Sequence, residues 1–407
     1  MGSFAPATDL ARKLLTAVQA PPLEALRPGR RRSRLSQRKA HRADAGQPRQ
    51  TTPGVDAPSQ PPSSARKTSG VAVLIPAYNE AACVADTIRS VQAQSLLPDE
   101  IIVVDDCSSD GTGDVARACG VRVVRTPGNT GSKATALNYA LQFIQQEFTL
   151  AIDADTTLAP DGIEKLMKAM EDQTAAAACG FVLPRHVNTI WERGRYVEYL
   201  FAFGLYKPIQ DYYDRPLLAS GCFSVYRTKV LRDHGGWPTR TVAEDMDLTW
   251  NVYLSGWKVR FVPEAMCYPI EPTNLSFLSR QLRRWTSGFI QTVKVHWRNV
   301  LHVPFLRSIV AIGLWDATVA SLAFLLILPI LAITVSPLFL LGYVIDLPAV
   351  LVPVLYQAAR RGEVMKAITS LPGFFVMRFI NAFFMLDAIW REVIRPKQSV
   401  KVFEKGH

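Results

Sequence analysis

The sequence lacks the cysteine patterns of a metal site. Six cysteines occur among 407 residues, and none of them stands in a CxxC or other metal-ligand spacing. Most of them lie inside apolar runs, which is typical of reduced thiols in a reducing compartment. We therefore expect free cysteines.

Two phosphate-binding signatures and two N-terminal signals are also missing. The chain has neither a Walker-type loop nor a GxGxxG fingerprint, which excludes the commonest NTPase and dinucleotide-binding motifs. The opening residues MGSFAPATDLARKLL contain no apolar signal-peptide core, and Pro6 stands where myristoylation needs Ser or Thr. We expect neither a cleaved leader nor N-myristoylation.

Excess positive charge is scarce outside the N-terminal region. Residues 1–70 contain thirteen Lys and Arg against four Asp and Glu, which is about +9 of the net charge of +11. The rest of the chain is near neutral, so nucleic acid is not an expected partner. Residues 1–69 are basic and Pro/Ser-rich, a composition that cannot bury enough apolar surface to fold. We predict a disordered arm, either a solvated linker or a segment that binds an anionic leaflet.

From Val71 onward the sequence alternates β-branched runs with helical stretches. The runs are VAVLIPAYN, IIVVDDCSS, VRVVRTP and TLAIDAD, with helical stretches at 81–93, 111–119 and 133–146. Apolar strands between helices predict an α/β domain with a mostly parallel sheet covered on both faces. Nucleotides bind such sheets at the carboxyl ends of the strands. Polar residues occur at those ends: Tyr78, Asn79, Glu80, Asp105, Asp106, Asp153 and Asp155.

Asp153 and Asp155 form a DxD pair. Alternate residues leaving a strand can direct oxygen ligands at one hard cation that bridges two phosphates, so we predict Mg²⁺ or Mn²⁺ here. Lys133 follows a Gly-containing turn at the start of a helix, where anions are favoured. The alternatives are a carboxylate that caps the next helix and a solvated helix lysine.

Glu244 and Asp245 are an acidic pair, and QLRRW at 281–285 is a basic and aromatic cluster. A carboxylate beside a second carboxylate tends to have a raised pKa, which suits a general base near neutral pH. Two arginines beside an indole suit a phosphate-bearing leaving group and a stacking surface for a ring. The alternative is an acidic helix N-terminus followed by a basic amphipathic helix on a membrane.

Seven motifs occur in a fixed order: IPAYNEA at 75–81, VVDDCSSDGT at 103–112, GNTGSKATALN at 128–138, DAD at 153–155, SGCFSVYR at 220–227, AEDMDLTW at 243–250 and QLRRW at 281–285. The set resembles a processive family-2 glycosyltransferase, the family of cellulose, chitin and hyaluronan synthases. Within it, bacterial poly-N-acetylglucosamine synthases look most similar.

The resemblance implies a GT-A type nucleotide-sugar-binding domain at 70–274. The residues that match its nucleotide-sugar pocket are Ala77, Tyr78, Glu80, Asp105, Asp106, Lys133 and Asp153. Asp155, with Asp153 as its DxD companion, matches the metal-binding aspartate, and Asp245, beside Glu244, matches the general base. The matches for the acceptor and leaving group are Gly221, Cys222, Gln281, Arg283, Arg284 and Trp285. One departure is Ala243, because Thr often precedes the acidic pair in the family.

The C-terminal part is expected to attach the protein to a membrane. Residues 275–306 have the period of interfacial amphipathic helices, and 307–390 contain three apolar segments, at about 309–333, 337–357 and 367–390. Each could cross about 30 Å of hydrocarbon. Basic flanks predict a hairpin with its turn near Ser336. Pro372, Gly373, Arg378 and Asn381 interrupt the third segment, so two or three spans remain open, followed by a basic tail at 391–407.

The resemblance, together with the apolar C-terminal part, implies a main function and an alternative. The protein is expected to be a multi-pass enzyme of the inner (plasma) membrane with a cytoplasmic catalytic domain. It would polymerise a β-linked polysaccharide from a UDP-sugar, with UDP-N-acetylglucosamine as the first choice. The growing glycan and the bilayer are expected partners, and export or accessory subunits are candidate ones. The alternative is a single addition to a lipid or polyprenyl phosphate.

Overall fold

The structure is a computed structural model that describes residues 69–300, 302–396 and 399–400. The predicted N-terminal arm lies outside the described residues, apart from Ser69. Residues 397–398 and 401–407 of the predicted tail lie outside them as well.

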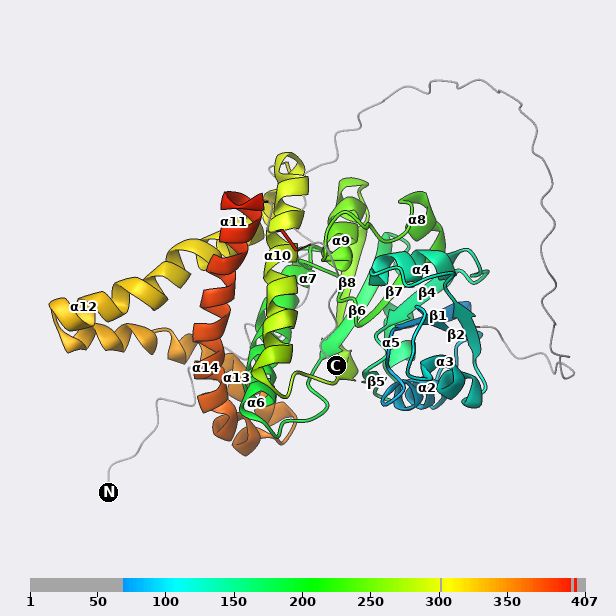
Figure 1. Ribbon diagram of the computed structural model, residues 1–407, viewed down its shortest axis with the longest axis horizontal. Coiled ribbons are helices and arrows are strands. Elements are labelled where there is room, and N and C mark those ends of the chain that lie inside the picture. Colours follow the sequence, from blue (N-terminus) through cyan, green and yellow to red (C-terminus); the bar gives the residue numbers. More distant parts are fainter. Residues whose placement is uncertain (1–68, 301, 397–398, 401–407) are drawn as a thin grey trace, which may run out of the picture. The chain divides into compact units, whose positions relative to one another are not determined.

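An eight-stranded sheet forms the centre of the α/β part, in the order β3-β2-β1-β4-β7-β6-β8-β5 (Figure 1). Four of its seven strand pairs are parallel, which confirms the expected mostly parallel sheet. The strands are β1 (Val71–Ala77), β2 (Glu100–Asp105), β3 (Arg122–Arg125), β4 (Phe148–Ile152), β5 (Thr156–Leu158), β6 (Ala175–Val182), β7 (Phe223–Arg227) and β8 (Lys258–Pro269).

The four strands predicted from the sequence form the parallel half of the sheet. β1 pairs with β2 and β4, and all seven of its residues are buried, as expected for an apolar run covered on both faces. Parallel pairing brings the carboxyl ends of these strands to one edge of the sheet. β7 is antiparallel to both β4 and β6, so the sheet becomes mixed beyond β4.

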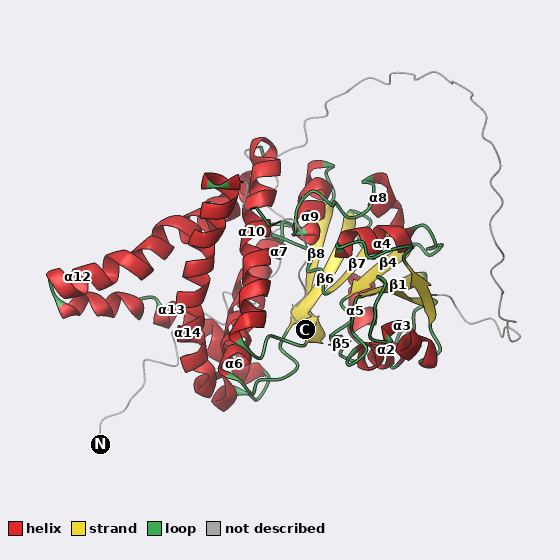
Figure 2. Ribbon diagram, in the orientation of Figure 1, coloured by secondary structure: helices red, strands yellow, loops and turns green. Residues whose placement is uncertain are grey.

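Helices cover the sheet, and the helical stretches predicted before β4 are confirmed with shorter bounds (Figure 2). The helices of this part are α2 (Val84–Gln92), α3 (Thr112–Ala118), α4 (Lys133–Leu141), α5 (Gly162–Ala169), α6 (Ile190–Phe201), η1 (Ala202–Tyr206), α7 (Lys207–Tyr212), α8 (Thr228–Asp233) and α9 (Glu244–Leu254). The Ser132 side chain caps α4 by accepting a hydrogen bond from the backbone of Thr135 at 3.5 Å. This cap fixes where α4 begins, and therefore where Lys133 lies.

The segment after β8 is a single long helix, α10 (Leu275–Val300), which carries the QLRRW cluster. The face that contains Leu278 and Leu282 packs against Met377 and Phe384, which belong to α14 (Val364–Ile389). This apolar face of α10 is therefore covered by protein along that stretch.

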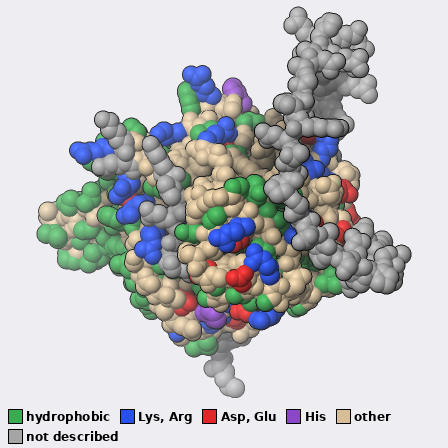
Figure 3. Space-filling view, turned by 45° about the vertical axis from the view of Figure 1, so that its right-hand side comes forward, with side chains coloured by type: hydrophobic (Ala, Val, Ile, Leu, Met, Phe, Trp, Pro, Cys, Tyr) green, Lys and Arg blue, Asp and Glu red, His purple; other side chains and the backbone are tan. Residues whose placement is uncertain are grey.

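Three helical segments of the described chain are long and apolar enough to cross a membrane: Phe305–Thr334, Pro337–Arg360 and Val364–Ile394. They contain α11 (Pro304–Trp315), η2 (Asp316–Ala320), η3 (Ala323–Ile327), α12 (Leu328–Thr334), η4 (Pro337–Tyr343), α13 (Leu347–Arg360), α14 and η5 (Trp390–Ile394). Hydrophobic side chains gather on the lobe at the left of Figure 3, which corresponds to the helices around α12 in Figure 1. Large exposed hydrophobic residues of this region include Ile330, Ile333, Leu338 and Leu341.

The third apolar segment is a continuous helix, although the sequence suggested a break. Pro372 lies inside α14, and the adjacent Gly373 allows close packing against α6. A Cβ on Gly373 would lie 2.4 Å from the Ile190 carbonyl oxygen and 2.8 Å from the Gly194 nitrogen. The polar residues also have partners: Arg378 pairs with Asp346 at 2.8 Å, and Asn381 donates a hydrogen bond to Glu198. These residues serve contacts within the protein, which explains why they interrupt an apolar pattern.

Candidate active site

A cleft of about 690 Å³ opens at the carboxyl ends of β1, β2 and β4 and is bounded by α9 and α10. Most of the predicted site residues line it. They are Ala77, Tyr78, Asp106, Lys133, Asp153, Asp155, Gly221, Cys222, Glu244, Asp245, Gln281, Arg284 and Trp285. The edge of the parallel half-sheet therefore brings together residues that are more than 200 positions apart in the sequence.

Asp106 organises one end of the cleft. Its carboxylate accepts hydrogen bonds from the Thr126 hydroxyl at 2.8 Å and from the Thr130 hydroxyl and backbone at 2.9 and 3.0 Å. These bonds hold the loop that leads into α4, and Asn129 and Gly131 of that loop line the cleft as well. Tyr78 lines the same cleft with 41% of its surface exposed, so its ring can stack on a planar ligand.

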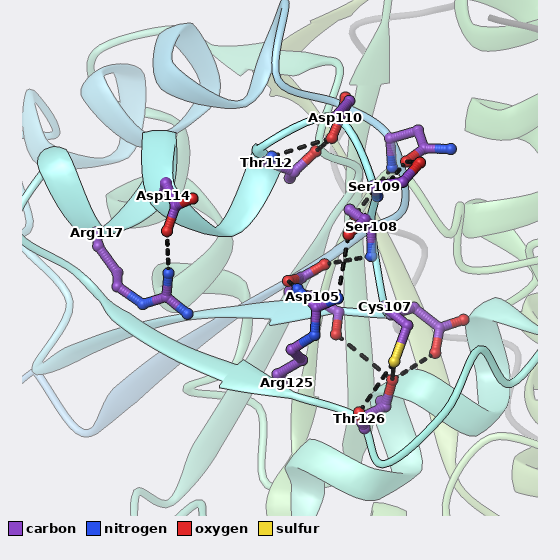
Figure 4. Close-up of polar contacts among 12 residues, drawn as sticks. Asp105, Cys107, Ser108, Ser109, Asp110, Thr112, Asp114, Arg117, Arg125 and Thr126 are labelled. Atoms are coloured by element: carbon purple, nitrogen blue, oxygen red, sulfur yellow. Dashed lines mark hydrogen bonds and ion pairs between the residues drawn. The ribbon is translucent and has the colours of Figure 1, made fainter.

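Asp105 and Glu80 were predicted to contact the nucleotide, but neither lines the cleft. Asp105 is fully buried and pairs with Arg125 at 2.7 Å, and it also accepts the Ser108 backbone N–H at 2.9 Å (Figure 4). Glu80 is buried too, and it accepts a hydrogen bond from the Cys83 thiol. Both carboxylates hold the loops that follow β1 and β2, so their contribution to the cleft is through loop geometry.

Lys133 lines the cleft from the first position of α4. Its ammonium group donates to the Asp153 carboxylate and to the Gly221 carbonyl oxygen at 2.9 Å, and it lies 3.8 Å from Glu244 Oε1. Burial lowers the pKa of Lys133, but the carboxylates of Asp153 and Glu244 outweigh this effect and raise it. The lysine is therefore a permanent positive charge that joins the β4 end to α9.

The DxD aspartates differ in their surroundings. Asp153 bonds to Lys133, whereas the Asp155 carboxylate accepts a hydrogen bond from the neighbouring Thr156 hydroxyl at 3.1 Å, and both residues line the cleft. No cluster of three or more metal-ligating side chains occurs in the described ranges. Mg²⁺ in proteins is commonly bound through one or two carboxylates plus substrate phosphates. The residues present therefore fit a divalent ion that shares its ligands with a diphosphate.

Asp245 lies in the first turn of α9, and backbone groups fix its carboxylate. Oδ2 accepts the Gly221 N–H and Oδ1 accepts the Met246 N–H, at 2.9 and 2.8 Å. A Cβ on Gly221 would lie 3.1 Å from the Lys133 Nζ and 3.2 Å from Asp245 Oδ2, so this position needs a very small residue. Next to it, burial raises the pKa of Glu244, and Asp245 adds to the rise while Lys133 opposes it.

The helical period of α10 decides which residues of QLRRW reach the cleft. Gln281, Arg284 and Trp285 are spaced i, i+3 and i+4, so they share one face, and all three line the cleft. Arg283 was predicted to join them but points elsewhere. Its Nε lies 3.4 Å from Asp387 Oδ2 on α14, and its guanidinium lies 5.7 Å from the ring centre of Phe384.

Residues 72–235 match the protein family described as "Glycosyl transferase family 2". This segment is therefore similar to family-2 glycosyl transferases. The chain is also similar to poly-beta-1,6-N-acetyl-D-glucosamine synthases. It is 27% identical to that of Staphylococcus epidermidis over 278 residues, which are 64% of this chain and 66% of the relative. For Staphylococcus aureus (strain COL) the identity is 28% over 259 residues, which are 60% of this chain and 62% of the relative. The chain thus spans slightly less than two thirds of these relatives.

The fold of this segment is that of GT-A enzymes. A solved mannosyltransferase, PcManGT from Pyrobaculum calidifontis in complex with GDP-Man and Mn2+, matches with a TM-score of 0.54 at 19% sequence identity. The match covers 80% of this chain and 88% of that chain. At this identity the similarity concerns the fold, and it confirms the predicted fold class.

A buried charge cluster next to the acidic pair Glu244 and Asp245 was not predicted. Asp247 is fully buried and accepts two hydrogen bonds from Arg240, at 2.8 and 2.7 Å, and lies 2.6 Å from His296 Nε2 on α10. Burial raises the pKa of Asp247, but the bonds from Arg240 and His296 outweigh this and lower it. The cluster ties α9 to α10. Asp247 belongs to the AEDMDLTW motif, but its partner on α10 is 49 positions away, so the sequence gives no signal for the pairing.

The departure at Ala243 is explained by a second contact between α9 and α10. A Cβ on Gly288 would lie 2.6 Å from the Ala243 Cβ and 3.2 Å from its nitrogen. The two helices therefore touch through the smallest side chains, one position before Glu244 and three after Trp285. A Thr at 243 would add two heavy atoms to an already tight contact.

We expect Gly288→Ala to separate α10 from the acidic pair Glu244 and Asp245. Overpacking a tight contact typically costs about 1–3 kcal/mol, so the melting temperature of the purified protein should fall. Turnover should fall as well, because Trp285 and Asp245 move apart. Gly128→Ala is the matched control for stability, since a Cβ there would meet no atom within 4 Å. Equal melting temperatures of the two variants would contradict the contact.

Proposed function

We propose that the protein is a membrane-bound inverting glycosyltransferase that extends a β-linked glycan from a UDP-sugar, with UDP-N-acetylglucosamine as the donor. The observation that carries the proposal is the convergence of three groups on one cleft. They are Lys133 with Asp155, the carboxylate of Asp245, and the Gln281–Trp285 face of α10. The choice of sugar is supported by the relatives named poly-beta-1,6-N-acetyl-D-glucosamine synthase.

The donor would occupy the end of the cleft next to the parallel strands. Tyr78 offers a ring for stacking against uracil, and the loop held by Asp106 surrounds the nucleoside. Arg284 lines the cleft from α10, where a guanidinium can bind a diphosphate through two hydrogen bonds. Lys133 adds a buried positive charge on the other side. The diphosphate is thus held between α4 and α10.

A divalent cation, Mg²⁺ or Mn²⁺, would neutralise part of the negative charge that develops on the departing UDP. Asp155 would hold it, together with phosphate oxygens of the donor, and Asp153 would remain paired with Lys133. Lys133 thereby keeps Asp153 from repelling the diphosphate.

Asp245 would act as the general base. A sugar hydroxyl has a pKa far above neutral, so its attack on the anomeric carbon needs a positioned acceptor for the proton. The two backbone N–H groups hold the Asp245 carboxylate in one orientation, and each oxygen keeps a second lone pair for the acceptor hydroxyl. The acceptor would attack from the face opposite UDP, so an α-linked donor gives a β-linked product. Trp285 and Gln281 would hold the acceptor ring.

The apolar helices around α12 would anchor the protein as a hairpin. The start of the hairpin touches the catalytic part through stacking of Phe305 on Tyr213, with ring centres 4.3 Å apart. The end of the hairpin contacts the catalytic part through Arg361, whose guanidinium lies 4.4 Å from the ring centre of Phe181. Both ends therefore lie on the side of the catalytic domain, which the positive-inside tendency assigns to the cytoplasm of the inner membrane.

α14 would lie beside the catalytic domain and would not cross the bilayer. Near its start Glu363 accepts a hydrogen bond from the Tyr196 hydroxyl at 2.8 Å, and beyond its end Glu392 accepts one from Gln291 at 3.0 Å. Tyr196 belongs to α6 and Gln291 to α10, which are both elements of the cleft region. This arrangement keeps the basic C-terminal residues cytoplasmic, so two spans satisfy the charge rule.

Asp245→Asn tests the base. We expect turnover to fall by about 10²–10⁴-fold, because the amide cannot take the proton, while UDP binding is retained. UDP release, product linkage and UDP binding should be measured on the same preparation. Asp114→Asn, an exposed carboxylate on α3, is the control and should leave turnover unchanged. Near-native turnover of Asp245→Asn, or an α-linked product, would refute the proposed mechanism.

Removal of divalent ions tests the metal. With excess EDTA we expect loss of transfer, and addition of Mg²⁺ or Mn²⁺ should restore it. Asp155→Asn should abolish transfer even at saturating metal, because a neutral amide is a weaker ligand for a hard cation. Full activity of the wild-type protein in excess chelator would rule out the metal site.

Cysteine labelling from outside intact cells tests the topology. Ser336→Cys at the hairpin turn should react with a membrane-impermeant maleimide, whereas Arg360→Cys and His407→Cys should react only after permeabilisation. Labelling of His407→Cys in intact cells would mean that α14 crosses the membrane. Labelling of Arg360→Cys would mean that the hairpin is wrong.

A further inference from the structure

A buried arginine lies directly behind the acceptor face of α10. Arg195 belongs to α6 and is 3% exposed. Its guanidinium carbon lies 4.7 Å from the ring centre of Trp285, and one of its nitrogens donates to Gln281 Oε1 at 3.1 Å. Arg195 thus contacts two of the three α10 side chains that face the cleft.

Arg195 packs against the indole of Trp285, which lines the cavity. Trp285 lines the cleft and is 38% exposed, whereas Arg195 is not among the lining residues. The guanidinium lies over the ring, while part of the same side chain remains exposed in the cleft. A cation over one face of an indole is favourable, more so when it is desolvated, and it fixes the plane of the ring. The remaining face is then presented to the cleft in one orientation.

Carboxylates around Arg195 keep it charged and hold it in place. One nitrogen donates to Glu198 Oε2 at 2.8 Å, and Nε lies 3.8 Å from Glu271 Oε2. Burial lowers the pKa of Arg195, but Glu198 and Glu271 outweigh this effect and raise it. Glu198 in turn accepts a hydrogen bond from Asn381 of α14. Asn381 of α14 therefore helps to hold Arg195 in place through the Glu198 carboxylate.

We propose that Arg195 is a positioning residue for the acceptor. It holds the Trp285 ring and the Gln281 amide so that a sugar ring of the acceptor glycan can stack on the open indole face. The inference rests on the proposed function, because it concerns the acceptor of that reaction. Arg195 does not touch the donor pocket, so its effect should be confined to acceptor use.

A double-mutant cycle in the full-length protein tests this role. UDP release is measured with a short β-linked N-acetylglucosamine oligomer as the varied acceptor, and UDP binding is measured separately. Arg195→Met should lower kcat/KM for the oligomer by about tenfold to a hundredfold, since it removes a charged hydrogen bond and the ring contact. UDP binding should change by less than about twofold. In a Trp285→Ala background, Arg195→Met should lower kcat/KM by a clearly smaller factor, because only the hydrogen bond to Gln281 then remains to be lost.

Two further variants make the cycle decisive. Arg195→Lys keeps the charge between Glu198 and Glu271, so it should fold, but it lacks the planar fork and should still lose about tenfold in kcat/KM for the oligomer. Arg193→Met is the matched control: Arg193 lies two positions away on α6 and donates to the Thr369 carbonyl oxygen of α14, without contacting Trp285. It should leave acceptor kinetics unchanged.

The possible outcomes distinguish the positioning role of Arg195 from the proposed function. Wild-type acceptor kinetics in Arg195→Lys, or equal effects of Arg195→Met with and without Trp285, would overturn the positioning role while the proposed function stands. Absence of transfer by the wild-type protein from every UDP-sugar offered would overturn the proposed function, and the inference with it.

Discussion

The cleft contains several carboxylates, and its structure depends on a positive charge that balances them. Asp153, Asp155, Glu244 and Asp245 all line one cavity, and a diphosphate would bring more negative charge to it. Carboxylates that share one cavity repel one another strongly where water is displaced. Lys133 relieves this repulsion, because its ammonium bonds to Asp153 and lies within 4 Å of Glu244. Its position depends on the Ser132 cap and on the loop held by Asp106, so the β2 end and the α4 start are arranged around this one charge.

The second constraint is the distance between α9 and α10. These helices carry the acidic pair and the QLRRW cluster, and they are joined at two levels. Ala243 and Gly288 touch without intervening side-chain atoms, and Asp247 and His296 form a buried polar contact further along. A small-residue contact sets the distance, and a polar contact of defined direction sets the rotation. The cleft is therefore a consequence of how these two helices pack.

The sequence allowed much of the fold and of the site to be predicted, for local reasons. Strands β1 to β4 are apolar runs, and the residues at their ends are read directly from the order of the chain. The helical period separates Arg283 from Gln281, Arg284 and Trp285, although the prediction placed all of them in the site. Glu80 and Asp105 occur in the same motifs as cleft residues, and only the three-dimensional packing shows that they face the loops. Arg195 and Asp247 pair with residues 90 and 49 positions away, and no local pattern predicts such contacts.

The contact between α6 and α14 bears on the order of events during synthesis. α6 leaves the ribosome long before α14, and domains tend to fold from the N-terminus as they are made. The sheet and the Asp106 loop can form at that stage. Leu278 and Leu282 of α10, and the surface of α6 at Gly194, stay uncovered until α14 has been made. The loops that would surround the nucleoside can thus form while the α10 side of the cleft is still open. A nascent chain would be able to hold a nucleotide before it could hold a glycan.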